Sequence, residues 1–350
     1  MTTTLNVVAL LVGLLPLQRM QASAQPIFRE DAFVSSDPGV VLFVRHVRGA
    51  RADGVPILLV HGGGGASLAA FDLSVPGYSV AADLAGAGHP VYLMDVRGFG
   101  LSSRLPALDE PADRHPPLVP AAEAARDIAA VVEWIQRRHA GRRVALIGWA
   151  SDGHWAGLYT TRHNEKVSHL ILLNTLYGVA APWGLARAFE DPERPGSFNR
   201  RNAAYREADR EALLAAWTRA IPTDAKEQWR HPAVAELYAW TAIASDPTSG
   251  ARVPPSLRVP GAFREEAYHL ARGRKYWEAS DIRVPVLVLR GEHDHWSRPE
   301  DVEALEADLV NAPVVRTVTI PGATHFLFLD RPERGRQACL REIMSFLRSR

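Results

Sequence analysis

Short apolar runs alternate with helical stretches along most of the chain. Beyond residue 27, seven runs are rich in Val, Ile and Leu and typical of β-strands: Val40–Val47, Val55–Val60, Pro90–Asp95, Val144–Ile147, His169–Leu173, Val284–Leu289 and Val314–Ile320. Between several of them lie helical stretches, of which Ala121–Arg138 places its apolar residues on one face. This alternation predicts an α/β fold, with a mostly parallel sheet covered by helices on both faces. We expect Val40–Val47 and the strand before it to form a hairpin at the edge of the sheet.

The alternation of strand and helix patterns stops over residues 176–279. Strand patterns are missing there, polar helical segments carry many Trp and Tyr residues, and Pro247–Pro260 is a linker rich in Pro, Ser and Gly. The strand pattern then resumes at Val284. An insertion of this kind predicts a helical cap over one end of the sheet. The expected core is therefore made of residues 27–175 and 280–350.

The first 24 residues predict a signal peptide. An apolar run of about eleven residues, Val7–Leu17, precedes Ala22–Ala24, which has the A-x-A form of a cleavage site. The run is too short for a membrane span, which needs about 20 residues. The segment Met1–Asn6 lacks the Lys or Arg usual at the start of a signal. We expect a secreted or periplasmic protein, or a cytoplasmic one if Met20 is the true start.

Composition excludes several classes of function. Forty basic and thirty-nine acidic side chains leave a formal net charge of +1, which gives no reason to expect nucleic acid or an acidic membrane surface as partner. A single cysteine, Cys339, excludes an intrachain disulfide and a zinc cage of several cysteines. We expect a small-molecule partner, no nucleic acid and no stable membrane span. Composition carries no information about the oligomeric state.

Five local motifs each follow a predicted strand or end it. They are Val60–Gly65, Asp95–Ser103, Leu146–Gly153, Leu289–Asp294 and Pro321–His325. A glycine run directly after a strand lets backbone N–H groups point into a cleft. Gly62 and Gly63 are therefore candidate donors to a developing oxyanion. A tight turn that needs positive φ is the structural alternative for these glycines.

In this order the motifs resemble the α/β-hydrolase superfamily, over roughly residues 30–348. The resemblance implies a capped serine hydrolase in which Asp294 is the triad acid and His325 the base, since the chain order nucleophile, Asp, His is that of the family. The acid would fix the tautomer of the histidine. No metal or organic cofactor is implied. His293 and His295 flank Asp294, but adjacent residues at a strand end cannot easily converge on one ion.

The nucleophile elbow is where the sequence departs from the family. The motif reads G-x-nucleophile-x-G. With Gly148 as the first glycine, the nucleophile position holds Ala150, which cannot attack. A shift by one residue makes Ser151 the nucleophile and Gly153 the second glycine, but it puts Trp149 where a small residue belongs. Both registers stay open.

The expected function is hydrolysis of a carboxylic ester or similar acyl substrate of moderately apolar character, as in esterases, lipases and lactonases. In this mechanism Ser151 attacks, His325 moves the proton, Asp294 orients it, and Gly62 and Gly63 hold the oxyanion. Alternatives are a catalytically impaired binder with this fold, and lyase or oxygenase chemistry that depends on the histidine without a serine nucleophile. A deliberate serine-to-alanine replacement at position 150 would also explain the alanine.

Overall fold

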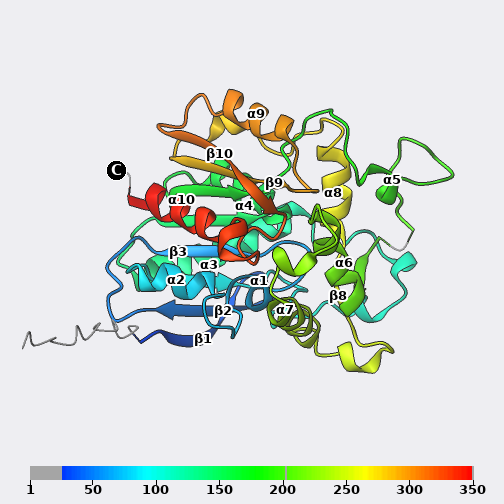
Figure 1. Ribbon diagram of the computed structural model, residues 1–350, viewed down its shortest axis with the longest axis horizontal. Coiled ribbons are helices and arrows are strands. Elements are labelled where there is room, and N and C mark those ends of the chain that lie inside the picture. The colour runs from blue at the N-terminus through cyan, green and yellow to red at the C-terminus, as the bar shows by residue number, and fades with distance from the viewer. Residues whose placement is uncertain (1–25, 202, 349–350) are drawn as a thin grey trace, which may run out of the picture.

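The computed structural model of the protein describes residues 26–201 and 203–348 (Figure 1). The predicted signal peptide, residues 1–24, lies outside the described residues. No helix within the described ranges combines the length and the apolar character needed to cross a membrane.

An eight-stranded sheet forms the centre of the fold, with the strand order β1-β2-β4-β3-β5-β6-β9-β10. Its strands are β1 (Phe28–Ser35), β2 (Val41–Arg48), β3 (Ile57–Val60), β4 (Val91–Met94), β5 (Val144–Trp149), β6 (Val167–Leu173), β9 (Val286–His293) and β10 (Val315–Thr324). The pairs β1–β2 and β2–β4 are antiparallel, and all pairs from β4 to β10 are parallel. This arrangement confirms the predicted mostly parallel sheet and its edge hairpin.

Helices cover both faces of the sheet. They are α1 (Ser67–Phe71), α2 (Val80–Gly86), α3 (Ala121–Arg138), α4 (Ser151–Arg162), α9 (Pro299–Asp308) and α10 (Arg336–Arg348). Helices α3 and α4 pack on each other and on the sheet, whereas α2 packs with α10, in front of the sheet in Figure 1. Every residue of β3, β4, β5 and β6 is buried, as parallel strands between two helical layers require.

The segment between β6 and β9 forms the cap. It contains α5 (Ala186–Phe189), β7 (Tyr205–Asp209), α6 (Arg210–Ala220), α7 (Pro232–Ala244), β8 (Ser256–Pro260) and α8 (Ala262–Leu270). Figure 1 shows α5, α6, β8 and α8 gathered at one end of the sheet. Short 3₁₀ helices occur at Pro106–Asp109, Ala112–Arg114, Lys226–Gln228, Ser249–Ala251, Ala279–Asp281 and Pro332–Arg334.

The expectation of a cap without strands was wrong. Strands β7 and β8 pair antiparallel, with Tyr205 opposite Pro260, and β8 takes up the end of the expected linker. Only Ala208 is buried along β7, and the other four residues of this strand are polar or aromatic and partly or fully exposed. The strand therefore lacks the apolar alternation by which strands are predicted.

Tryptophans of the cap attach it to the core. The indole N–H of Trp217 donates to Asp330, that of Trp229 to the carbonyl of Gly322, and that of Trp183 to the carbonyl of Trp296. The Trp217 ring also stacks on Phe326, with centroids 4.9 Å apart and an interplanar angle of 18°. These contacts join the cap to the end of β10 and to the loops after β9 and β10.

Candidate active site

The turn between β5 and α4 has the backbone of a nucleophile elbow, with Ala150 at its apex. Trp149 ends the strand, Ser151 begins the helix, and Ala150 between them has φ 56° and ψ −117°. Positive φ is strained for a residue that carries a Cβ and is held only where the surroundings fix it. Of the two registers, the structure therefore has the one in which the nucleophile position holds alanine.

Glycine is required at positions 148 and 153, because neighbouring atoms leave no room for a Cβ at either position. A Cβ on Gly148 would lie 2.6 Å from the carbonyl oxygen of Asp152 and 2.6 Å from Cα of Gly153. A Cβ on Gly153 would collide with the hydroxyl of Thr175. The second glycine of the motif is thus displaced by one position, and Asp152 fills the usual place. Because of this displacement, each of the two registers satisfies only one of the two glycines.

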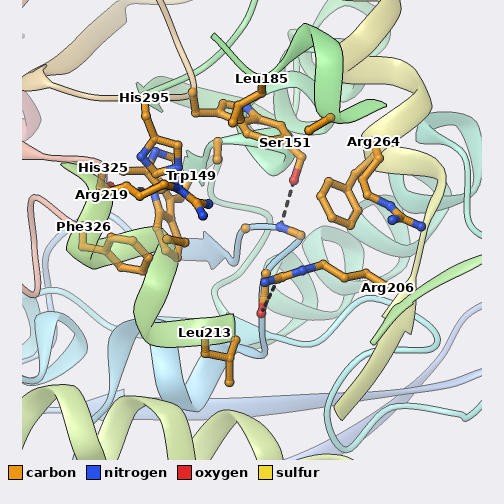
Figure 2. A pocket seen from close by; sticks show the side chains of 18 of the residues that line it. Trp149, Ser151, Leu185, Arg206, Leu213, Arg219, Arg264, His295, His325 and Phe326 are labelled. Atoms are coloured by element: carbon orange, nitrogen blue, oxygen red, sulfur yellow. Dashed lines mark hydrogen bonds between the residues drawn. The ribbon is translucent and has the colours of Figure 1, made fainter. Parts of the chain in front are cut away.

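The hydroxyl of Ser151 is not directed to His325. It accepts a hydrogen bond from the backbone N–H of Gly63 at 2.9 Å and donates one to Oδ1 of Asp152 at 3.0 Å. Figure 2 shows it pointing to the loop after β3, away from the imidazole. Although Ser151 lines the same cavity as His325, this geometry does not place it as a nucleophile needs to be placed.

The carboxyl of Asp152, which accepts the hydrogen bond from the Ser151 hydroxyl, is fully buried. Burial raises the pKa of Asp152 well above its usual value, and the Ser151 hydrogen bond only partly offsets this. Nδ1 of His61 lies 3.5 Å from the other carboxyl oxygen, and burial lowers the pKa of this histidine. Burial therefore favours the neutral form of both groups. The Ser151 hydroxyl is anchored to the interior of the fold.

The predicted oxyanion loop follows β3 and faces the cavity. Gly62 and Gly63 both line it, and neither has positive φ. A Cβ on Gly62 would lie 3.1 Å from the Trp149 ring, and one on Gly63 would lie 2.6 Å from the Phe263 ring. Close packing of two aromatic rings, and not turn geometry, requires glycine at these positions. The N–H of Gly63 currently donates to Ser151.

The structure brings Asp294 and His325 together. Nδ1 of His325 lies 2.6 Å from Oδ1 of Asp294. The carboxylate also accepts the backbone N–H groups of Trp296 and Ser297, and the Ser297 hydroxyl. Burial by itself raises the pKa of Asp294, but the His325 charge and these hydrogen bonds outweigh it and lower the pKa below its usual value. An ionised Asp294 fixes the proton of His325 on Nδ1 and leaves Nε2 as the basic nitrogen.

The backbone of His325 is fixed from the core. Its carbonyl oxygen accepts the indole N–H of Trp149 at 3.1 Å and the side-chain amide of Asn174 at 2.9 Å. The Trp149 ring lies beside the imidazole, with centroids 5.1 Å apart. Trp149, the bulky residue before the apex, therefore supports His325. In the register with Ser151 as nucleophile, the same residue would occupy a position that the motif reserves for a small residue.

Asp294, His295 and His325 also form a group whose possible ligand atoms lie within 4.8 Å of one another. The carboxylate oxygens of Asp294 already accept four hydrogen bonds, and Nδ1 of His325 donates one of them. Burial lowers the pKa of His295 to about 3, so this ring is neutral. The donor arrangement fits a hydrogen-bonded His–Asp pair with a neutral neighbour better than a metal centre.

A cavity of about 360 Å³ lies between the elbow and the cap. Ala150, Ser151 and His325 line it from the core, and mostly apolar side chains line it from the cap. Three cap arginines also line it, Arg206, Arg219 and Arg264 (Figure 2). These arginines could not be identified from the sequence, because the cap segment contains many other arginines and no local pattern distinguishes those that line the cavity.

Comparison with known proteins places this geometry in a family. A family model described as alpha/beta hydrolase fold matches residues 55–332. The chain is 31% identical over 169 residues to 1-acylglycerol-3-phosphate O-acyltransferase ABHD5 of Sus scrofa, a match covering 48% of this chain. The match spans only about a third, 36%, of that relative's length.

Solved structures with the same fold cover nearly the whole chain. A thermophilic esterase from Thermogutta terrifontis has a TM-score of 0.56 at 20% identity, over 91% of this chain and 100% of that one. A bromoperoxidase from Bacillus anthracis has a TM-score of 0.60 at 14% identity, with the same coverage of both chains.

Proposed function

The chain belongs to the α/β-hydrolase fold family, and from this premise we propose that it hydrolyses a carboxylic ester or related acyl substrate with a water molecule activated by His325. One observation carries the proposal. An intact His325–Asp294 pair faces a cavity whose apex residue, Ala150, has no nucleophilic atom. The nearby Ser151 hydroxyl is bound to Gly63 and Asp152 instead.

In this mechanism, Nε2 of His325 removes a proton from water as the oxygen adds to the substrate carbonyl carbon. Asp294 stabilises the imidazolium that forms. The tetrahedral intermediate then expels the alcohol oxygen, which takes the proton back from Nε2. One water is consumed, and the products are the acid and the alcohol.

The developing oxyanion would lie between two backbone donors. The N–H of Ser151 follows the apex, where the family has one donor, and the loop after β3 supplies the other. At Gly63 the oxyanion would replace the Ser151 hydroxyl as acceptor. The finer role first assigned to Ser151 thus changes from attacking the substrate to occupying the Gly63 donor between turnovers.

The relatives support acyl chemistry for this chain but do not fix its substrate. The relative from Sus scrofa is named as an acyltransferase, and one structural neighbour is an esterase. Apolar side chains such as Leu213, Tyr238 and Phe326 give the cavity walls suited to an acyl chain.

A second candidate is a binding protein without catalysis. The alanine at the apex favours it directly, because the usual covalent step is then impossible. A cavity of this size without a nucleophile would still hold a ligand.

Hydrolysis of 4-nitrophenyl butyrate by the wild type and three variants tests these candidates. General-base catalysis contributes about 10²–10⁴-fold, so His325→Ala should lose activity by that factor. Ser151→Ala should keep it within about threefold. His293→Ala is the matched control, since this histidine does not line the cavity. Loss of activity in Ser151→Ala would overturn the water mechanism, and absence of His325-dependent activity in every form would favour the binder.

A further inference from the structure

Three arginines project from the cap into the cavity that contains His325. Arg206 comes from β7, Arg219 from α6 and Arg264 from α8. Figure 2 shows them spread around the cavity, with Arg219 on the side of His295 and His325. Three separate elements thus contribute a guanidinium to one small space.

Two of these arginines, Arg206 and Arg219, lack a balancing carboxylate among the described residues, whereas Arg264 donates to the carbonyl of Tyr205 at 2.9 Å. Nη1 of Arg206 donates to the carbonyl of Gly64 at 3.4 Å. Glu207 lines the cavity too, but its carboxylate is paired with Arg258 at 2.9 Å and accepts the hydroxyl of Ser256.

Two buried arginines elsewhere in the fold are paired with carboxylates, whereas the buried Arg290 donates to backbone carbonyls. Arg97 is paired with Asp127, and Arg298 binds Asp301 through two nitrogens. Such pairing is the rule because an unpaired buried charge is costly. Arg206 is half-buried and Arg219 is exposed at the cavity, where a substrate would bind, and in the described part of the chain neither has such a carboxylate partner.

Burial and neighbouring arginines lower the pKa values of Arg206 and Arg264. Burial lowers the pKa of Arg206, and the charge of Arg219 lowers it further. Burial lowers the pKa of Arg264 to about 10, with a further contribution from Arg206. The charge of Arg219 also contributes to the low pKa of His295, whose ring centroid lies 4.7 Å from that of His325. A bound anion would relieve this repulsion.

We propose that the substrate carries an oxyanion group, a carboxylate or a phosphate ester, which binds between Arg206 and Arg219 with Arg264 beside them. This inference rests on the proposed function, since it assigns the substrate class of the same site. The planar guanidinium fork matches both kinds of oxyanion. A cavity of about 360 Å³ is at the small end of ligand sites, so the anion and the scissile carbonyl lie within one short molecule.

Binding measured without turnover tests the anion site. Isothermal titration of the His325→Ala protein with glutarate, inorganic phosphate and neutral glutaramide separates the two oxyanions from a matched uncharged ligand. We expect glutarate or phosphate to bind and glutaramide not to bind. Arg206→Gln and Arg219→Gln should each weaken anion binding by about tenfold or more, as loss of a charge-assisted hydrogen bond predicts. Their thermal unfolding shows whether each variant is folded.

Arg230→Gln is the matched control. Arg230 lies in the cap, donates to a backbone carbonyl and contacts the Trp217 ring, but does not line the cavity. Anion affinity should be unchanged in this variant. Equal affinity in the Arg206, Arg219 and Arg230 variants, or no binding of either anion, would overturn the inference.

Kinetics distinguish failure of the inference from failure of the proposed function. We expect kcat/KM for mono-4-nitrophenyl glutarate to exceed that for 4-nitrophenyl pentanoate by about tenfold or more, and Arg219→Gln to abolish the preference. Equal His325-dependent hydrolysis of both esters would leave the proposed function standing and overturn the anion site. Arginine-dependent anion binding without hydrolysis would overturn the proposed function and leave the site standing.

Discussion

Ala150 occupies a backbone conformation that costs about 1–3 kcal/mol for a residue with a Cβ. The glycines at 148 and 153 hold this conformation, because they let the strand and the helix approach closely. The elbow is thus complete in its backbone although its apex has lost the reactive atom. The sequence could not decide between Ala150 and Ser151, because each register satisfied one of the two glycines. Only packing shows that both are needed.

Serine at the apex should restore the covalent route. In Ala150→Ser the new hydroxyl stands where the family has its nucleophile, beside the His325–Asp294 pair. We expect kcat/KM for 4-nitrophenyl butyrate to rise by roughly 10²–10⁴-fold. The variant should also become sensitive to serine-reactive fluorophosphonates, to which the wild type is resistant. An unchanged rate together with inhibition of the wild type would contradict the assignment of the apex.

A methyl group on Gly63 should disturb the oxyanion loop. The added Cβ would lie 2.6 Å from the Phe263 ring, so the loop or the ring must move. We expect Gly63→Ala to lose about 1–3 kcal/mol of unfolding free energy and most of its activity. Gly65→Ala is the matched control, because the nearest atom to its Cβ would be 3.7 Å away. Denaturant unfolding and ester hydrolysis should separate the two variants, and similar effects would count against this account.

At the scale of elements, the core strands were predictable because burial on both faces makes them continuously apolar. Helix α3 matches its predicted range, Ala121–Arg138, because one face packs on the sheet and the other meets water. Strands β7 and β8 were missed because backbone pairing, and not apolar alternation, defines them. Arg206 in β7 is an example, because its side chain lines the cavity and does not pack in an apolar core.

Glu266 couples the cap helix α8 to the core and should make stability depend on pH. Its carboxyl accepts the N–H of Ala121 at 2.6 Å and the indole N–H of Trp155 at 2.9 Å. Burial raises the pKa of Glu266 to about 7. Between about pH 4.5 and 7 the folded state therefore keeps a proton that the unfolded state has lost. Stability should fall with rising pH in this window, by up to about 3 kcal/mol for this group.

Unfolding of wild type and Glu266→Gln at several pH values measures this effect. The variant should show a shallower loss of stability between pH 4.5 and 7, with the remaining slope due to other buried carboxyls such as Asp330, whose pKa burial also raises to about 7. The control is Glu265→Gln, whose parent side chain pairs with Arg200. Equal slopes in all three proteins would show that Glu266 is ionised in the fold.

At the scale of the whole molecule, the position of the cap was predictable from the interruption of the strand pattern, but its function was not. Cap and core meet through indole N–H groups and stacked rings, and the cavity lies between them. The arginines of this cavity come from three elements far apart in sequence from His325. Contacts of this kind depend on how the cap lies on the core, which no local pattern records.

Removal of the Trp217 side chain should loosen the cap from the core. This residue is fully buried, stacks on Phe326 and donates to Asp330. We expect Trp217→Ala to lower the free energy of unfolding by about 3–5 kcal/mol. Trp240→Ala is the control, because Trp240 is 46% exposed and should cost less than about 1 kcal/mol. Equal losses in the two variants would contradict the proposed anchor.

The central claim is that water, and not a serine, attacks the substrate. Wild type should be mixed with 4-nitrophenyl acetate during steady turnover, quenched and weighed by intact-protein mass spectrometry, with His325→Ala as background and Ala150→Ser as positive control. We predict His325-dependent release of nitrophenolate without an acyl adduct on the wild type, and an adduct on Ala150→Ser. An acyl adduct on the wild type that maps to Ser151 and disappears in Ser151→Ala would contradict the claim.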